Sequence, residues 1–264
     1  MKRIHTFSLY LIMILIPLIN LQAKTIIVDI QGSGNYTSIA IAVNLAQDGD
    51  TVKVLPGTYS EQINITKAIV LMGSGYEYTT ITSSSDPTVT INAGKIMWFS
   101  ITSNGGSGIL FNAGTVTNCV ILSCAKNGIE IKRNDYAISG AISNCVLFGN
   151  GGYGVYQSGA TGDIYIQNSI SYNNGKEGFW SETHFLYVNY CNGSTYNTNG
   201  NVGNLIVNPS FVSNSDFHLS LISQSINAGN MALLDPDGTR SDMGYFGGPD
   251  CPIYPVVTDI QIIP

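Results

Sequence analysis

The chain of 264 residues is long enough to bury a sizeable core, and only 11% of its residues are charged, against about 25% in an ordinary soluble domain. The low charge excludes a coiled coil or helical bundle, and the 44% of hydrophobic residues exclude a charge-driven disordered chain. The formal net charge of -6 argues against nucleic acid as a partner, because phosphate contacts require clustered lysine and arginine.

The first 23 residues have the layout of a secretory signal peptide. A positive start (Lys2, Arg3) and an apolar run over residues 7–21 precede the small residue Ala23 at the expected cleavage point. The run is short for a membrane span and contains a proline, so cleavage is favoured over an uncleaved anchor. The mature chain then begins at Lys24, and its formal charge falls from -6 to -8 because two cations are lost. We expect an exported monomer with no membrane span in its mature form.

Residues 24–49 are expected to form an N-terminal strand and a capping helix. Residues 25–30 read as the strand. Thr37 or Ser38 can N-cap a short helix that carries Ile39, Val43 and Ala46 on one face. The coils that we predict for residues 50–208 follow directly, beginning with GDTVKVLPGTY.

An internal repeat governs the central part of the chain. Three segments whose starts lie 26 and 24 residues apart align without a gap, and they read VTNCVILSCAKNGIEI from Val116, ISNCVLFGNGGYGVYQ from Ile142 and IQNSISYNNGKEGFWS from Ile166. Each holds short alternating strands separated by glycine and asparagine turns, and none has a helical pattern. Short strands that recur at equal intervals without helices predict the stacked coils of a parallel β-helix.

Aligned side chains in such a stack form ladders with a spacing of about 4.8 Å. Asn118, Asn144 and Asn168 align, and we expect these buried amides to hydrogen-bond to one another up the stack, because an unpaired buried amide is costly. Cys119 and Cys145 align as well, and packed thiols are favoured over a disulfide between them.

The run GDTVKVLPGTYSEQINITKAIVLMGSG resembles the opening of right-handed parallel β-helix proteins of the pectin-lyase-like superfamily, and NCVILSCAKNGIEI resembles their coil consensus. The stretch NPSFVSNSDFHLSLISQSINAGN, followed by DPDGTRSDMGYFGGP, is similar to the closing cap of the secreted bacterial type. The resemblance implies an all-β fold, a right-handed parallel β-helix with a short N-terminal capping helix and an irregular C-terminal cap over residues 209–250. Residues 251–264 then form a linker or the start of a following module.

The superfamily includes lyases, hydrolases, esterases, epimerases and proteins without known catalysis, so the resemblance specifies the fold and not the reaction. The catalytic motifs of polygalacturonases, pectin methylesterases and pectate lyases are not recognisable in the sequence. The resemblance does imply that a saccharide chain binds along an exposed sheet face.

The coil register identifies the side chains on one such face, because the second and fourth residues after the aligned glycine point outward. One outward column holds Leu110, Glu130, Tyr156 and Trp180, and the column beside it holds Asn112, Lys132, Ser158 and Glu182. The two aromatic side chains, with Asn112 and Ser158 beside them, are the candidate substrate-binding residues, since exposed rings at this spacing match successive sugar rings. The structural alternative is that the two rings stack on each other.

Glu130, Lys132 and Glu182 are the candidate catalytic residues. A lysine base supports β-elimination, and a carboxylate pair supports glycoside hydrolysis. The two glutamates lie two coils apart, about 10 Å by strand spacing, which is wide for the roughly 6.5–9.5 Å of an inverting pair. Surface charges on a solvated face are the alternative interpretation.

Three carboxylates in the C-terminal region suggest a calcium site. Asp235, Asp237 and Asp242 surround a glycine turn and offer hard oxygen ligands for Ca²⁺. The closing glutamate of an EF-hand is missing, and pairing of Arg240 with one of the aspartates is the favoured alternative.

Two classes of function remain open. One is a secreted protein that binds an extracellular polysaccharide along the exposed face, with a lyase or hydrolase activity that no recognised motif supports. The other is a non-catalytic surface, scaffold or adhesion module.

Overall fold

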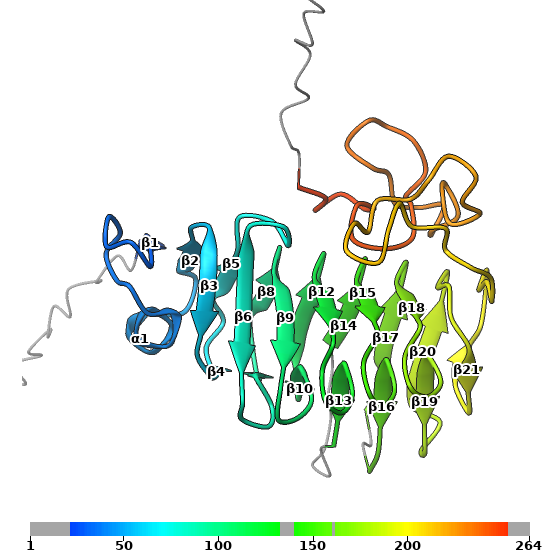
Figure 1. Ribbon diagram of the computed structural model, residues 1–264, viewed down its shortest axis with the longest axis horizontal. Helices are drawn as coiled ribbons and strands as arrows, with labels where there is room; N and C mark the ends of the chain where they lie inside the picture. Colours follow the sequence, from blue (N-terminus) through cyan, green and yellow to red (C-terminus); the bar gives the residue numbers. More distant parts are fainter. Residues whose placement is uncertain (1–21, 133–139, 160–161, 253–264) are drawn as a thin grey trace, which may run out of the picture.

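A computed structural model describes residues 22–132, 140–159 and 162–252 of the chain. The strands form three parallel sheets, and successive coils contribute neighbouring strands to each sheet, which confirms the predicted right-handed parallel β-helix. Figure 1 shows the coils stacked along the long axis of the molecule. Residues 1–21 of the expected signal peptide and residues 253–264 of the expected linker or following module lie outside the described residues.

The sheets are named A, B and C here. Sheet A contains, in spatial order, β1 (Thr25–Val28), β2 (Thr51–Val54), β5 (Val70–Met72), β8 (Lys95–Met97), β11 (Gly114–Thr117), β14 (Gly140–Ser143), β17 (Ile164–Gln167), β20 (Leu186–Asn189) and β22 (Asn199–Gly200). Sheet B contains β3 (Gly57–Ser60), β6 (Thr79–Ser83), β9 (Ser100–Ser103), β12 (Val120–Leu122), β15 (Val146–Phe148) and β18 (Ile170–Tyr172). Sheet C contains β4 (Ile63–Ile65), β7 (Val89–Ile91), β10 (Ile109–Phe111), β13 (Ile129–Ile131), β16 (Val155–Gln157), β19 (Phe179–Ser181) and β21 (Thr195–Tyr196).

The helix α1 (Ile39–Leu45) lies at the N-terminal end of the solenoid, as Figure 1 shows. Ser38 is its N-cap, and the Ser38 side chain accepts a hydrogen bond from the Ile41 amide. The Glu61 carboxylate accepts hydrogen bonds from the amides of Ile39 and Ala40. A side chain that directly follows β3 thus satisfies two more of the free N–H groups at the start of the helix. The predicted capping helix is therefore confirmed.

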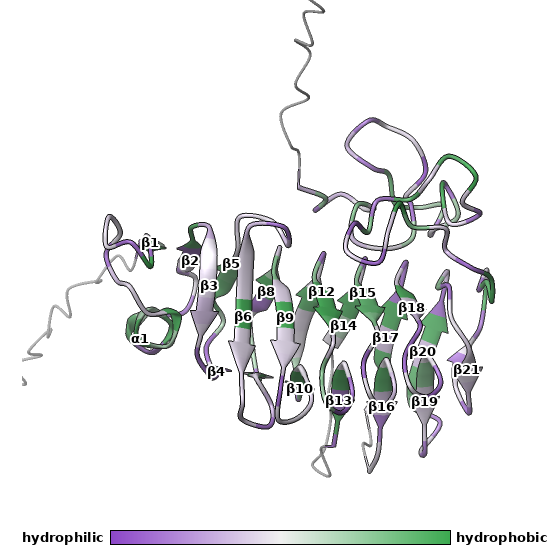
Figure 2. Ribbon diagram, viewed as in Figure 1, coloured by the Kyte–Doolittle hydropathy of each residue, from purple (hydrophilic) through white to green (hydrophobic). Residues whose placement is uncertain are grey.

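The interior of the solenoid is filled by the inward side chains of the alternating strands. In the aligned coils Val116, Ile142 and Ile166 are buried, as the register predicts. Figure 2 shows β6 and β9 pale apart from one hydrophobic band, because each has a single isoleucine among serine and threonine. Burial of this kind supplies most of the free energy that holds the coils together.

The cysteines of the described part are free thiols, which confirms packing over a disulfide for Cys119 and Cys145. Both are fully buried, together with Cys191 of a later coil. Burial raises the pKa of the Cys119 thiol to about 12, so this thiol stays protonated and unreactive at neutral pH.

The corner between sheets A and B requires a left-handed backbone residue in each of the later coils. The residues at this corner have positive φ angles, and they are Trp98 (φ 68), Asn118 (φ 44), Asn144 (φ 50), Asn168 (φ 51) and Tyr190 (φ 52). Asparagine is favoured there because it tolerates this conformation better than other residues with a Cβ atom. We call these five residues the corner column.

The predicted hydrogen bonds between the aligned asparagines are wrong. Asn118, Asn144 and Asn168 do stack in register, since the strands before them pair directly. Their amides bind residues 208–252 instead: Nδ2 of Asn118 donates to the carbonyl oxygens of Tyr245 (2.7 Å) and Gly247 (2.9 Å). The amides point outward at the corner, and residues 208–252 pass along the corner column, so their carbonyl oxygens lie within reach of these amides.

Residues 208–252, the C-terminal segment, are irregular, as predicted, and pack along the side of the solenoid. Figure 1 shows this segment over the ends of β12, β15 and β18. A second apolar core forms beneath it, where Val146 and Ile170 of sheet B meet Phe217, Met243 and Tyr245. Among the described residues, no helix is long and apolar enough to span a membrane.

Candidate functional site

The outer face of sheet C carries the predicted column of side chains. Strand pairing places Leu110 beside Glu130, Glu130 beside Tyr156 and Tyr156 beside Trp180, and it extends the column to Tyr196. The inward neighbours in these strands are buried, so the alternation set by the aligned glycine is confirmed.

A groove of about 460 Å³ lies on this face across the later coils. Its lining comes from three successive coils, namely Ala125, Lys126, Asn127, Gly151, Gly152, Tyr153, Tyr156, Lys176, Trp180 and Glu182. Asn127 fixes the position of Tyr153, because its Oδ1 accepts a hydrogen bond of 2.9 Å from the Tyr153 amide. A Cβ atom on Gly152 would come within 2.3 Å of the same oxygen, so a larger residue at this turn would displace the Asn127 side chain that holds Tyr153.

The aromatic rings of the groove form a continuous strip. Tyr156 stacks on Tyr153 with ring centroids 5.1 Å apart, and Tyr153 meets Trp180 at 5.3 Å. Trp180 stacks on Tyr196 at 3.9 Å and an interplanar angle of 10°. The direct stacking of Tyr156 on Trp180, one alternative for this face, is therefore replaced by stacking through Tyr153. We call these four residues the aromatic strip.

Charged groups border the aromatic strip. The Lys176 ammonium lies 4.8 Å from the centroid of the Tyr153 ring, within cation–π range. The Tyr156 hydroxyl donates a hydrogen bond of 2.6 Å to Oε1 of Glu182. This bond to a carboxylate, together with burial, raises the pKa of Tyr156 to about 12, so the phenol remains a donor at any physiological pH. Lys126 is ion-paired with Asp86 at 2.6 Å.

The predicted exposure of Glu130 is wrong. Glu130 lies on the outer side of β13, but only 7% of it is exposed, because Ser107 of the preceding coil donates to Oε2 (2.9 Å) and Lys132 is ion-paired with Oε1 (2.7 Å). Glu182 is two coils away and accepts from Tyr156 instead. The three predicted catalytic side chains are thus not brought together around one point.

Asn112 and Ser158 are also outside the groove. Nδ2 of Asn112 donates to Oδ1 of Asn92 (3.0 Å), and Nδ2 of Asn92 donates to Oδ1 of Asn64 (3.0 Å). An amide ladder of the kind predicted for the corner column therefore exists on sheet C. Of the predicted substrate-binding residues, the groove collects Tyr156 and Trp180.

The three predicted calcium ligands accept backbone hydrogen bonds. Asp235 accepts from the Asp242 amide (2.9 Å), Asp242 from the Asn227 amide (2.7 Å) and Asp237 from the Thr239 amide (2.9 Å). In the described part of the chain no group of three or more acidic, histidine or cysteine residues is arranged to hold a metal ion. The geometry assigns these carboxylates to the turns of the C-terminal segment.

Arg240 does not pair with these aspartates, contrary to the sequence interpretation. Its Nε donates to the Gly229 carbonyl (2.6 Å) and its Nη2 to the Ala228 carbonyl (3.0 Å), while its guanidinium lies 5.9 Å from the Tyr190 ring centroid. The guanidinium therefore ties the segment to the corner column.

The predicted site omits two side chains that line the groove, Tyr153 and Lys176, and the ring of Tyr196 that extends the aromatic strip. Tyr153 directly precedes the aligned Gly154, Lys176 lies two positions before the aligned Gly178, and Tyr196 follows the last regular repeat. The register predicts the direction of side chains within strands, and it gives no direction for side chains in turns. An aromatic residue beside the aligned glycine was the available signal for Tyr153.

No protein-family profile and no curated protein matches the chain. Solved structures that resemble it include two pectin methylesterases. The enzyme from carrot aligns over 70% of this chain and 89% of its own, with 14% identity and a TM-score of 0.38. The deglycosylated enzyme from Aspergillus niger aligns over 69% of this chain and 82% of its own, with 16% identity and a TM-score of 0.45. At these values no activity or site residue transfers to this chain, and its fold rests on its own strand pairing.

Proposed function

We propose that the protein is an exported saccharide-binding β-helix that holds an extracellular polysaccharide in the groove on sheet C. The observation that carries this proposal is the aromatic strip, a row of partly exposed rings bordered by hydrogen-bonding groups. Sugar rings have apolar C–H faces and polar rims, so a site for them combines aromatic surface with a few placed polar groups. The polysaccharide runs along the stacking direction of the coils.

Binding is favoured over catalysis by how the ionisable groups are engaged. Lys132 and Glu130 pair with each other, and Lys126 pairs with Asp86. Lys176 is the remaining cation of the groove lining, and it lies over Tyr153. A lyase for anionic polymers needs a basic groove to neutralise substrate charge, and the paired lysines do not supply one.

A glycan array and a depolymerisation screen on the mature chain test this proposal. We expect binding to at least one extracellular polysaccharide without the release of shorter products. If products were released, and if Lys132→Ala or Glu182→Ala abolished their release while binding persisted, the protein would be an enzyme and the proposal would be wrong.

One observation favours a non-catalytic scaffold as the second candidate. Trp180 and Tyr196 stack on each other, so each ring has one face covered by the other. Rings that serve only to stabilise the sheet would pack in the same way. Under this alternative Trp180→Ala and Tyr156→Ala reduce stability, and no glycan on the array binds.

A further inference from the structure

A second place on the molecule has the properties of a saccharide site, at the end of sheet B. Two cavities of about 320 and 380 Å³ meet there, between β18 and the start of the C-terminal segment. They share three lining residues, Tyr172, Asn173 and Asn208. Each volume falls at the lower end of the range of small-molecule sites, about 300–1,000 Å³.

The first cavity exists because the inward column of sheet B changes character in the last coils. Ile121 and Leu147 fill this column in the preceding coils, and the strand register places Ser171 next. The Ser171 hydroxyl is engaged, donating to the Gly178 carbonyl (3.1 Å) and accepting from Asn174 (3.0 Å). The smaller polar side chain leaves room where the earlier coils hold a branched apolar one.

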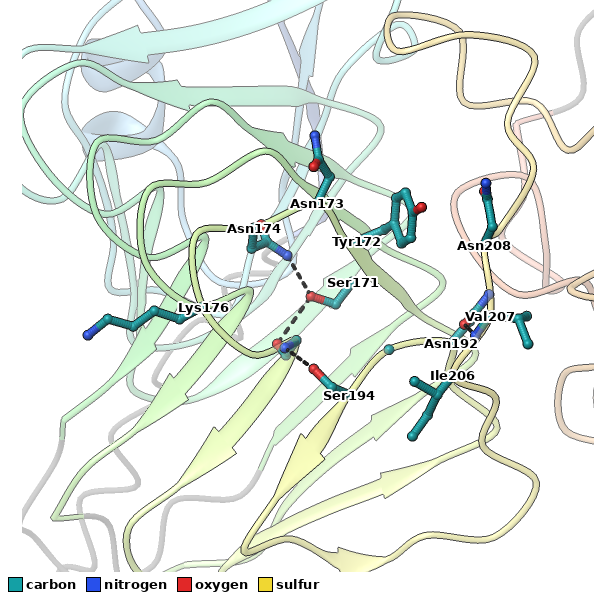
Figure 3. A pocket seen from close by; sticks show the side chains of 12 residues that line it. Ser171, Tyr172, Asn173, Asn174, Lys176, Asn192, Ser194, Ile206, Val207 and Asn208 are labelled. Carbon is teal, nitrogen blue, oxygen red and sulfur yellow. Dashed lines mark hydrogen bonds between the residues drawn. The ribbon is translucent and has the colours of Figure 1, made fainter.

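The shared wall of the two cavities offers an open aromatic ring. Tyr172 is 36% exposed, and within the described residues its ring has no aromatic partner. Figure 3 shows Tyr172 and Asn208 on opposite sides of the opening, one from β18 and one from the start of the C-terminal segment. In the aromatic strip, by contrast, every ring already meets another ring.

Uncommitted polar groups line the same cavities. In the part of the chain that the structure describes, the side chain of Asn173, Nδ2 of Asn208 and the Tyr172 hydroxyl have no hydrogen-bond partner. Ser194 accepts from the Gly178 amide (2.9 Å), and its own proton remains available. These groups supply donors and acceptors for the hydroxyls of a sugar.

The cavities are also nearly free of charge. Among the described residues, no acidic side chain lines either of them, and Lys176 is the one cation in the lining. Its side chain extends away from the cavity in Figure 3, and its ammonium lies over Tyr153 on sheet C. The site therefore suits a neutral ligand, because a charged one would lose its hydration without gaining a partner.

We propose that the two cavities form a binding site for a neutral, hydroxyl-rich saccharide, with Tyr172 stacking on a sugar ring and the amides of Asn173 and Asn208 binding its hydroxyls. Lys176 lines both this site and the groove on sheet C, but none of the three side chains that bind the sugar here belongs to the groove, so the site stands or falls independently of the proposed function.

Amide chemical-shift mapping on the ¹⁵N-labelled mature chain tests this site. The probes are the neutral disaccharides maltose, cellobiose, mannobiose and galactobiose, with digalacturonate as the charged counterpart of galactobiose. We expect at least one neutral probe to shift the amides of Tyr172, Asn173 and Ser194 while those of Tyr153 and Trp180 stay in place.

Variants make the assignment specific. Tyr172→Ala is expected to weaken that binding at least tenfold and Tyr172→Phe less than threefold, whereas Trp180→Ala and the exposed control Tyr165→Ala leave it unchanged. The site would be refuted if no neutral probe shifted these amides, if Tyr172→Ala bound as the parent does, or if digalacturonate bound there as tightly as the best neutral probe. Loss of polysaccharide binding in Trp180→Ala alone speaks to the groove on sheet C and not to this site.

Discussion

At the scale of single residues, the corner column joins a backbone requirement to a tertiary contact. Asn118 is fully buried, adopts φ 44 and donates to two carbonyl oxygens of the C-terminal segment. Its Oδ1 accepts from the Thr117 hydroxyl at 2.8 Å, so the whole amide is engaged. The side chain therefore contributes both to the turn and to the docking of a segment more than 120 residues away.

Asn118→Ala is expected to lower the free energy of unfolding by about 3 kcal/mol, because it leaves buried carbonyls without a donor and places alanine in the left-handed region. Asn118→Gly loses the same hydrogen bonds, but glycine adopts the left-handed conformation of the turn without strain. The decrease in its free energy of unfolding is therefore expected to be smaller by about 1 kcal/mol. Urea denaturation of the three proteins measures both values. Equal losses in the two variants would show that the turn is not strained.

At the scale of elements, the C-terminal segment is held by polar contacts that depend on pH. Burial raises the pKa of Asp242 to about 6, with Asp235 and Asp237 adding repulsion, and the Asn227 amide opposes the shift. Burial also raises the pKa of Asp235. Between the ordinary value of 3.8 and about 6, the folded chain binds more protons than the unfolded chain.

The free energy of unfolding is therefore expected to rise as the pH falls from 7.5 to 5, by about 1.4 kcal/mol through Asp242. Asp242→Asn keeps the acceptor for the Asn227 amide and removes the charge. The free energy of unfolding of this variant is therefore expected to lack the increase that Asp242 gives the parent between pH 7.5 and 5. Thermal or urea unfolding at the two pH values provides the comparison. An identical pH dependence in parent and variant would contradict the assigned cause.

At the scale of the whole molecule, the C-terminal segment links coils that otherwise touch only their neighbours. It is bonded at Trp98 through Asp250, at Asn118 through Tyr245, and at Asn168, whose carbonyl accepts from the Gly244 amide at 2.7 Å. A solenoid with nearest-neighbour contacts unfolds in parts, and such a brace couples its coils.

Native-state hydrogen exchange measures this coupling. The Gly244 amide is expected to exchange as slowly as the Val146 amide of the central coils, which donates to the Cys119 carbonyl at 3.0 Å. Exchange of Gly244 on the timescale of a surface loop, with Val146 still protected, would show that the segment is a loose appendage.

The repeat pattern predicted the features that depend on local sequence spacing. It did not predict the contacts that side chains make with residues distant in the sequence. The side-chain directions of Tyr156 and Trp180 follow from period-2 alternation, and the local sequence narrows the N-cap to Thr37 or Ser38, of which the structure uses Ser38. The partners of Asn118 and the burial of Glu130 could not be predicted, because the groups that satisfy them come from another coil or from the C-terminal segment.

The central claim, that the aromatic strip on sheet C binds a saccharide, is tested most directly by calorimetric titration of the best glycan from the array. Trp180→Ala is expected to weaken binding at least tenfold, because it removes the ring that links Tyr153 to Tyr196. The matched control Tyr165→Ala removes another stacked ring, on the outer face of sheet A, and is expected to bind as the parent does. Unchanged affinity in Trp180→Ala, with the fold intact by circular dichroism, would contradict the claim.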